Sequence, residues 1–244
     1  MSRLPQQPAF ILNWRNKITD EHIARDTPFD WPALFGNSNP IDLEIGIGNG
    51  SFLVPFAHDY RNRNIVGIEI EGQYVRRADK RLTREGLTNS RLLIGDAKLY
   101  AWKLFADESI SDLYLNFPDP WFKKRHLKRR IVSPITLKMF TIKIQNVLTI
   151  VTDDEEYRDW VIECVDSVAC LEKVFPSYFV NELDGYYPTK YEKKWRAHGK
   201  AIFYMKFRKT GLPDIDVEEY RHSQNLDFAL NKIYKTAQAA PRVV

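Results

Sequence analysis

The chain has 244 residues, of which 44% are hydrophobic and 28% charged, and a net charge of +4, which suits an ordinary globular protein with one well-buried domain or two small ones. No apolar run approaches the roughly 18 residues that a membrane span requires, and the N-terminus "MSRLPQQPAF" lacks an apolar stretch of signal-peptide type. Because Cys164 and Cys170 fit no metal or redox spacing, we expect them to be reduced core residues in a cytoplasmic protein that holds no metal.

In chain order, residues 1–40 are expected to form a helical or irregular N-terminal lead-in. Short β-rich runs then alternate with stretches of helical spacing. The expected strands are 41–45, 64–70, 91–95, 112–117, 146–152 and 200–208, and the expected helices are 51–60, 72–86, 97–105 and 134–145. This alternation predicts an α/β core over residues 41–209 with a mostly parallel sheet. Residues 210–244 would form a C-terminal extension, in which a linker precedes an amphipathic helix over 223–238.

A glycine-rich segment, "DLEIGIGNGS", follows the first expected strand and contains Gly46, Gly48 and Gly50. Glycines are needed where a strand turns sharply into a helix and a ligand lies against bare backbone. A nicotinamide-dinucleotide site would require a glycine at position 51, which is Ser51. Glu44, two residues before Gly46, would repel a pyrophosphate but would suit a ligand that carries an amine or a sulfonium.

Acidic residues end the next two expected strands. Glu69 is placed where a carboxylate can accept both hydroxyls of a ribose, and Asp96 where a side chain can reach an adenine edge. Each acid could instead cap the helix that follows it. Together, the glycine turn and the two acids occupy three successive strand ends at the edge where α/β sheets bind ligands.

A basic loop, "NFPDPWFKKRHLKRR", follows the fourth expected strand. Pro118 and Pro120 stiffen the turn and fix the direction of Asp119. Trp121 could stack on a base. Residues 123–130 contain six Lys or Arg and no acid, so the rest of the chain carries 4 − 6 = −2. This local positive charge could follow phosphates, although a solvated loop or a localisation signal has the same composition.

Two further segments carry candidate polar residues. Asp153 ends the fifth expected strand, within "VTDDEEY". Thr189 and Glu192, within "TKYE", have the spacing of a helix capping box. Helix capping is an alternative reading of this segment that does not exclude contact with a substrate.

The glycine turn and the row of acids resemble the class I S-adenosylmethionine-dependent methyltransferases, over roughly residues 41–208. The resemblance implies a Rossmann-like fold, in which a mostly parallel, twisted sheet has helices on both faces and an antiparallel last strand. The whole set of motifs is similar to the bacterial tRNA (guanine-N7-)-methyltransferase family. The family's F-P-D-P-W and K-x-R-H-x-K-R-R match residues 117–130, and its T-[KR]-[YF]-E matches residues 189–192, whereas its usual "LKPGG" turn before strand five is missing.

The family resemblance implies transfer of a methyl group from S-adenosylmethionine to N7 of a guanine in the tRNA variable loop. The residues that would bind or face S-adenosylmethionine are Glu44, Gly46, Glu69, Asp96 and Asp119. Those that would contact the acceptor nucleotide and its RNA are Lys123, Asp153, Thr189, Lys190, Tyr191 and Glu192. A monomer and a homodimer are both compatible with the sequence.

Guanine N7 carries a lone pair and no proton, so its methylation needs no general base. Asp119 would act as the catalytic residue by offsetting the positive charge that develops on the purine. It could equally select guanine by accepting hydrogen bonds from N1–H and the N2 amine. Two other functions stay open: an exocyclic-amine methyltransferase of nucleic acids, whose second proline "DPW" lacks, and a non-catalytic RNA-binding protein.

Overall fold

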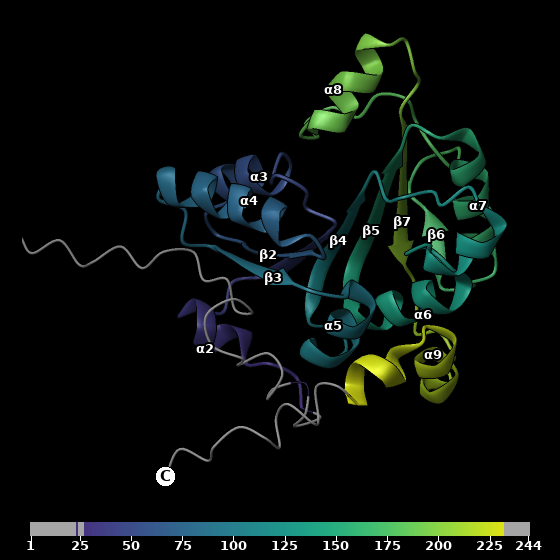
Figure 1. Ribbon diagram of the computed structural model, residues 1–244, viewed down its shortest axis with the longest axis horizontal. Coiled ribbons are helices and arrows are strands. Elements are labelled where there is room, and N and C mark those ends of the chain that lie inside the picture. The colour runs from purple at the N-terminus through teal and green to yellow at the C-terminus, as the bar shows by residue number, and fades with distance from the viewer. Residues whose placement is uncertain (1–22, 24–26, 232–244) are drawn as a thin grey trace, which may run out of the picture.

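The computed structural model describes residues 23 and 27–231, which form a seven-stranded sheet in the order β3-β2-β1-β4-β5-β7-β6 (Figure 1). β1 to β5 pair in parallel, and β7 is antiparallel to both of its neighbours. The strands are β1 (Ile41–Ile45), β2 (Asn64–Glu69), β3 (Ser90–Ile94), β4 (Ile110–Asn116), β5 (Ile144–Thr152), β6 (Leu171–Lys173) and β7 (Phe203–Lys209). The mostly parallel sheet with an antiparallel last strand is therefore confirmed, and β6 is an addition that the sequence did not predict.

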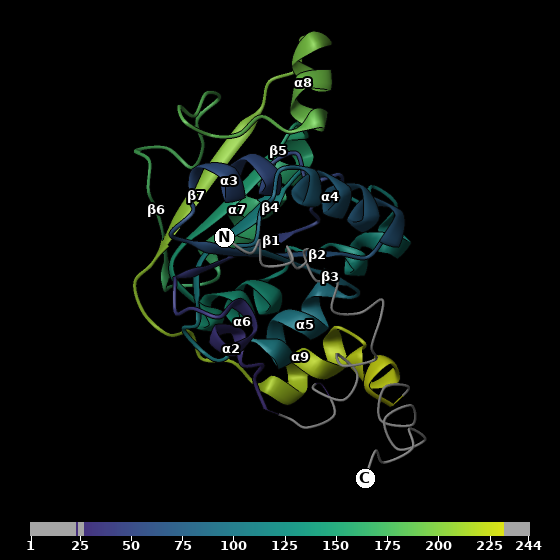
Figure 2. The same cartoon turned by 90° about the vertical axis from the view of Figure 1, so that its left-hand side faces the viewer.

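Helices cover both faces of the sheet, as predicted (Figure 2). One face packs on α3 and α4, and the other on α5, α6 and α7, so each face of the sheet carries an apolar core. The α-helices are α2 (Trp31–Phe35), α3 (Leu53–Asp59), α4 (Gly72–Arg84), α5 (Ala97–Leu104), α6 (Pro134–Lys143), α7 (Glu155–Asp166), α8 (Lys190–Ala197) and α9 (Val217–Ser223). A 3-10 helix, η1 (Lys124–Arg129), lies in the basic loop.

The connection between α6 and β5 has no loop residues, because α6 ends at Lys143 and β5 begins at Ile144. The backbone N–H of Ile144 still donates to the carbonyl of Phe140, so the chain passes directly from helix to strand. This is the short connection that the missing "LKPGG" turn predicts. It moves the start of the strand two residues earlier than expected.

The described part of the C-terminal extension packs on the core. Tyr220 of α9 is buried, and its hydroxyl donates to the carbonyl of Lys98 at 2.8 Å. Leu226 and Leu230 are buried in the same core as α5 and α6. Helix 226–231 follows α9, so the expected helix over 223–238 is partly present; residues 232–238 lie outside the described residues.

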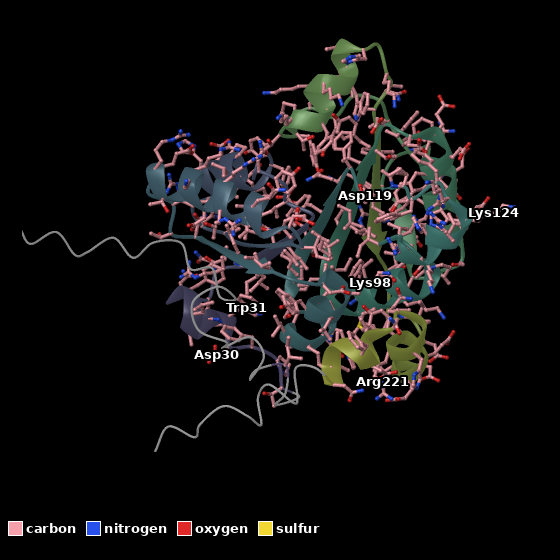
Figure 3. The ribbon with its side chains drawn as sticks, in the orientation of Figure 1. Asp30, Trp31, Lys98, Asp119, Lys124 and Arg221 are labelled. Carbon is pink, nitrogen blue, oxygen red and sulfur yellow. The ribbon has the colours of Figure 1, made fainter. Side chains whose placement is uncertain are left out.

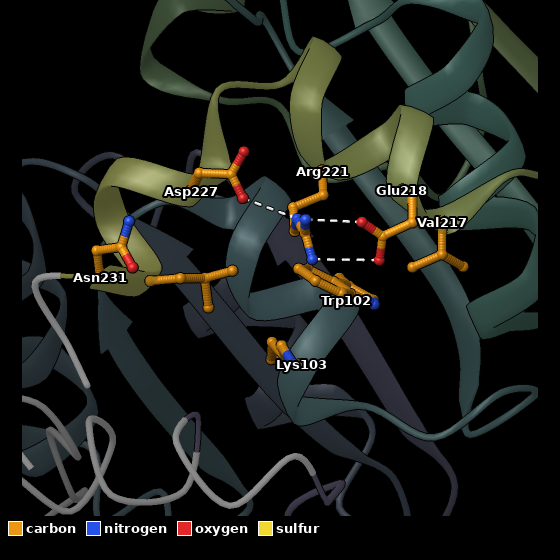
Figure 4. A pocket seen from close by; sticks show the side chains of 8 residues that line it. Trp102, Lys103, Val217, Glu218, Arg221, Asp227 and Asn231 are labelled. Carbon is orange, nitrogen blue, oxygen red and sulfur yellow. Dashed lines mark hydrogen bonds and ion pairs between the residues drawn. The ribbon is translucent and has the colours of Figure 1, made fainter.

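A polar cavity of about 500 Å³ lies between α5 and this extension (Figure 4). Arg221 forms ion pairs of 2.7 Å with both Glu218 and Asp227 across it. The Arg221 guanidinium is therefore already paired with two carboxylates, and Figure 3 places Arg221 far from Asp119 and the strand ends considered below.

Cys164 is buried in the core, where burial raises the pKa of its thiol to about 12, and Cys170 is half-buried; both are free thiols. Over residues 23 and 27–231, no helix is long and apolar enough to cross a membrane. In the same part of the chain, no group of three or more His, Cys, Asp or Glu side chains could hold a metal ion.

Candidate active site

The glycine turn lies at the carboxyl end of β1 and connects it to α3. Gly46 and Gly50 have φ of 77° and 75°, in the left-handed region that glycine adopts without strain. A Cβ on Gly50 would lie 3.0 Å from the Cβ of Ala78 in α4, so the turn also packs tightly against that helix. The turn thus leaves bare backbone at the edge where the parallel strands end.

Glu44 lies beneath this turn and is 1% exposed. Its Oε1 accepts a hydrogen bond of 3.0 Å from the side-chain amide of Asn116, whose own oxygen accepts one of 2.6 Å from the hydroxyl of Tyr186. Its Oε2 is buried without a hydrogen-bond partner among the described residues. Burial raises the pKa of Glu44 to about 8, and the charge of Glu69 adds to the effect. A bound cationic group would favour the ionised form of this carboxyl and could contact the free oxygen.

Glu69 and Asp96 end β2 and β3 and contact backbone amides. Glu69 accepts hydrogen bonds of 3.0 Å from the amides of Gly48 and Glu71, so it joins the glycine turn to the start of α4. Asp96 accepts a hydrogen bond of 2.8 Å from the amide of Lys98 and caps α5. Asp96 therefore caps the following helix, as the alternative interpretation predicts. Asp96 is nevertheless exposed at the edge of the sheet where the parallel strands end.

The loop after β4 has unusual backbone on both sides of Asp119. Phe117 and Trp121 have φ of 53° and 45°, a region that bulky residues rarely occupy. Such strain persists only where the surroundings enforce it, and it gathers at functional sites. Asp119 is exposed between the two (Figure 3). Trp121, expected to stack on a base, already contacts His126 and the guanidinium of Arg129 within the loop.

Thr189 is the N-cap residue of α8, as its spacing from Glu192 predicts, but the carboxylate of Glu192 contacts Tyr204 and Arg196 and leaves the capping box half formed. The Thr189 hydroxyl accepts a hydrogen bond of 3.1 Å from the Glu192 amide. The carboxylate of Glu192 is buried and accepts from the hydroxyl of Tyr204 at 2.5 Å and from Nε of Arg196 at 3.0 Å. These two residues therefore fasten α8 to β7, while Lys190 is exposed.

Tyr191 brings α8 toward the loop after β4. Its ring, 53% exposed as a residue, stacks at 6.3 Å on that of Phe117. Partial burial raises the pKa of Tyr191, and nearby Tyr74, Asp119 and Glu69 add to this effect. An exposed aromatic face thus lies close to both acids at the strand ends.

The remaining predicted residues, Asp153 and Lys123, lie further out. Asp153 forms an ion pair of 2.8 Å with Lys200, whose ammonium lies 4.2 Å from the ring centroid of Trp195. Lys123 is exposed immediately before η1. Figure 3 shows its neighbour Lys124 pointing outward beside α7. The sequence did not indicate Asn116 and Tyr186 as site residues. Asn116 could have been found because it directly precedes "FPDP", whereas no sequence signal marks Tyr186.

The strand order, the antiparallel β7 and the glycine turn define a class I methyltransferase fold. The solved structure of the 16S rRNA methyltransferase KamB superposes with a TM-score of 0.55 at 12% identity, over 75% of this chain and 93% of that one. The antibiotic-resistance methyltransferase Kmr gives 0.52 at 16% identity, over 75% and 92%. At these identities the likeness shows the fold alone.

The comparison of sequences is more specific. A family model described as "Putative methyltransferase" matches residues 38–205. The tRNA (guanine-N(7)-)-methyltransferase of Geobacter metallireducens is 34% identical over 75% of this chain and 89% of its own length. Those of Thermotoga maritima and Aquifex aeolicus are 35% and 36% identical, but the match spans only 58% and 62% of their lengths. The chain belongs to the tRNA (guanine-N7-)-methyltransferase family.

Proposed function

We propose that the protein transfers a methyl group from S-adenosylmethionine to N7 of a guanine in the variable loop of tRNA, giving 7-methylguanosine in the cytoplasm. Membership of the family supports the reaction and the substrate. The observation that carries the proposal is the exposed Asp119, held between two strained residues at the same sheet edge as the glycine turn and the acids that end β2 and β3.

The residues at the ends of β1, β2 and β3 fit S-adenosylmethionine, which supplies an electrophilic methyl group on a positively charged sulfur. The unpartnered buried oxygen of Glu44 suits a cationic group of that molecule, and the bare backbone at Gly46 allows close approach. Glu69 would accept the ribose hydroxyls, with its carboxylate already aligned by two backbone amides. Asp96 would face the adenine edge.

The acceptor guanine would lie between Asp119 and α8. Asp119 would offset the charge that develops on the purine, and the exposed ring of Tyr191 offers a face for the base. Lys123 and Lys190 would contact phosphates, and Asp153 would bind RNA after exchanging its ion pair with Lys200. Thr189 and Glu192 would contribute by holding α8 in place, with the buried, unpartnered Oε2 of Glu192 available to a donor.

Base-resolved mapping of methyl groups tests the function. The purified full chain is incubated with an unmodified tRNA transcript and labelled S-adenosylmethionine. We expect one methyl group, at N7 of a variable-loop guanine, and none when that guanine is replaced by adenine. A methyl group on an exocyclic amine would instead indicate the amino-methyltransferase. Binding of both ligands without transfer would indicate a non-catalytic RNA-binding protein.

Binding of S-adenosylmethionine is expected to release a proton from Glu44 below about pH 8. The free protein holds this carboxyl protonated because it is buried, and a cationic ligand favours the ionised form. Affinity should therefore rise with pH toward about 8 and then level off. Calorimetry in two buffers of different ionisation enthalpy measures the released proton. Glu44→Gln should abolish it, and identical binding enthalpies for the wild type in both buffers would contradict the assignment.

Glu69→Ala is expected to weaken S-adenosylmethionine binding by about 1.5–3 kcal/mol, the worth of hydrogen bonds to a charged group. The loss combines the missing ribose contacts with the loosened amides of Gly48 and Glu71. Glu71→Ala is the matched control, since this exposed neighbour makes no side-chain capping bond. Calorimetry on both folded variants is the measurement. If Glu69→Ala binds S-adenosylmethionine as tightly as Glu71→Ala does, Glu69 does not belong to the cofactor site.

A further inference from the structure

Arg130 behaves differently from the rest of the basic run. The sequence groups it with the residues that could follow phosphates, yet it is only 8% exposed, whereas Arg129 is exposed. Its Nε donates a hydrogen bond of 2.7 Å to the carbonyl oxygen of Pro120. Arg130 therefore faces into the molecule and has a protein partner, which favours a role other than the phosphate contact that the sequence suggests.

Two aromatic rings of α7 hold the Arg130 guanidinium. Its central carbon lies 5.4 Å from the ring centroid of Tyr157 and 5.1 Å from that of Trp160. Tyr157 is fully buried, and Nε1 of Trp160 donates to the carbonyl of Val132 at 2.9 Å, so both rings are fixed by the fold. Partly desolvated cation–π contacts of this kind stabilise the position of the cation. The guanidinium is thus anchored on a rigid helix.

The hydrogen bond to Pro120 closes the loop on itself, because Pro120 directly follows Asp119 and Arg130 is the residue that follows η1. The next residue, Trp121, has the strained φ of 45°, which the surroundings must enforce. We propose that Arg130 is a positioning residue that fixes the Pro120 carbonyl, and with it the direction of the Asp119 carboxylate. The predicted effect of Arg130 on the rate of methylation rests on the proposed function. The prediction that Arg130 does not contact phosphate is independent of that function.

The energetic consequence follows from the geometry that an electrostatic group requires. A preorganised carboxylate must be held within about 0.5 Å of its productive position. A displacement of about 1 Å can cost about 10²-fold in rate. Loss of Arg130 would release one end of the Asp119 turn while the exposed lysines and arginines of the loop keep their charges. The expected defect therefore lies in the chemical step.

Arg129→Ala and Arg130→Ala form a matched pair that separates the two roles. Arg130→Ala should lose about 10–10²-fold in single-turnover methylation at saturating tRNA and S-adenosylmethionine. The slope of log tRNA affinity against log salt should stay at the wild-type value. Arg129→Ala should instead reduce this slope by about 1. Arg130→Lys, which can still donate to the Pro120 carbonyl, should recover part of the rate.

A double-mutant cycle shows whether Arg130 acts through Asp119. In an Asp119→Ala background, Arg130→Ala should cost little further rate, because the carboxylate that it positions is gone. Independent, multiplying losses would overturn the proposal, and so would a salt slope that falls as much in Arg130→Ala as in Arg129→Ala. If Arg130→Ala fails to fold, the same cycle uses Arg130→Lys. Absence of methylation by the wild type would contradict the proposed function, while the salt slopes would still test the placement of Arg130.

Discussion

Arg63→Ala is expected to lower the free energy of unfolding by about 3–5 kcal/mol, because it leaves the buried carboxylate of Asp42 without its cation. Asp42 in β1 is fully buried and accepts two hydrogen bonds from the Arg63 guanidinium, at 2.7 and 2.5 Å. The same group reaches Asp112 of β4 at 3.2 Å and the hydroxyl of Ser111 at 3.0 Å. It therefore joins two central strands. Urea denaturation measures the loss.

The deficit should depend on pH. Burial raises the pKa of Asp42 to about 6 in the folded wild type, so the native state binds this proton more tightly than the unfolded chain and stability falls as pH rises from about 4 to 6. Without Arg63 the pKa of Asp42 rises further, so the variant continues to lose stability at pH values where the wild type no longer does. The difference in stability between wild type and variant should therefore be largest above about pH 6. Arg84→Ala is the control: its side chain is 72% exposed, and the change should stay within about 0.5 kcal/mol. Equal stabilities of the two variants in alkaline buffer would contradict the prediction.

The predictable part of the fold is the part that local pattern determines. β1 begins and ends where expected, because its apolar residues Ile41, Leu43 and Ile45 alternate along the chain and turn residues bound the segment. β6 has three residues, of which only Leu171 is buried, so no run marks it. It exists because β7 offers an open edge. Asp42 and Arg63 read as ordinary polar residues until the sheet brings them together.

The candidate site divides in the same way. Strand ends and fixed spacing indicate Glu44, Glu69 and Asp96, because parallel strands deliver their carboxyl ends to one edge. The neighbours that orient these acids come from far along the chain: Tyr186 reaches Asn116 across 70 residues. Arg130 shows the limit most clearly, since composition places it with phosphate-binding residues and only tertiary packing reveals that it is buried.

Asp119→Ala is expected to lower the methylation rate at saturating tRNA and S-adenosylmethionine by at least about 10²-fold. A carboxylate that offsets charge developing on the purine stabilises the transition state more than the ground state. Removal of one such preorganised group typically costs about 10²–10³ in turnover. Affinity for tRNA should stay within a few-fold, because the exposed basic residues of the loop are intact. Single-turnover kinetics measures the rate and filter binding the affinity.

Asp119→Asn separates charge from recognition, because it keeps the shape of the side chain and removes its charge. If charge dominates, the asparagine variant should be nearly as slow as the alanine variant. Inosine at the acceptor position, which lacks the N2 amine, should then react with the wild type much as guanine does. If recognition dominates, inosine should weaken wild-type activity but cause little further loss in the alanine variant, which has no side-chain oxygen to accept from the amine. The asparagine variant keeps one such oxygen and should retain part of the preference for guanine. Rates near the wild-type value in both variants would remove Asp119 from the catalytic role.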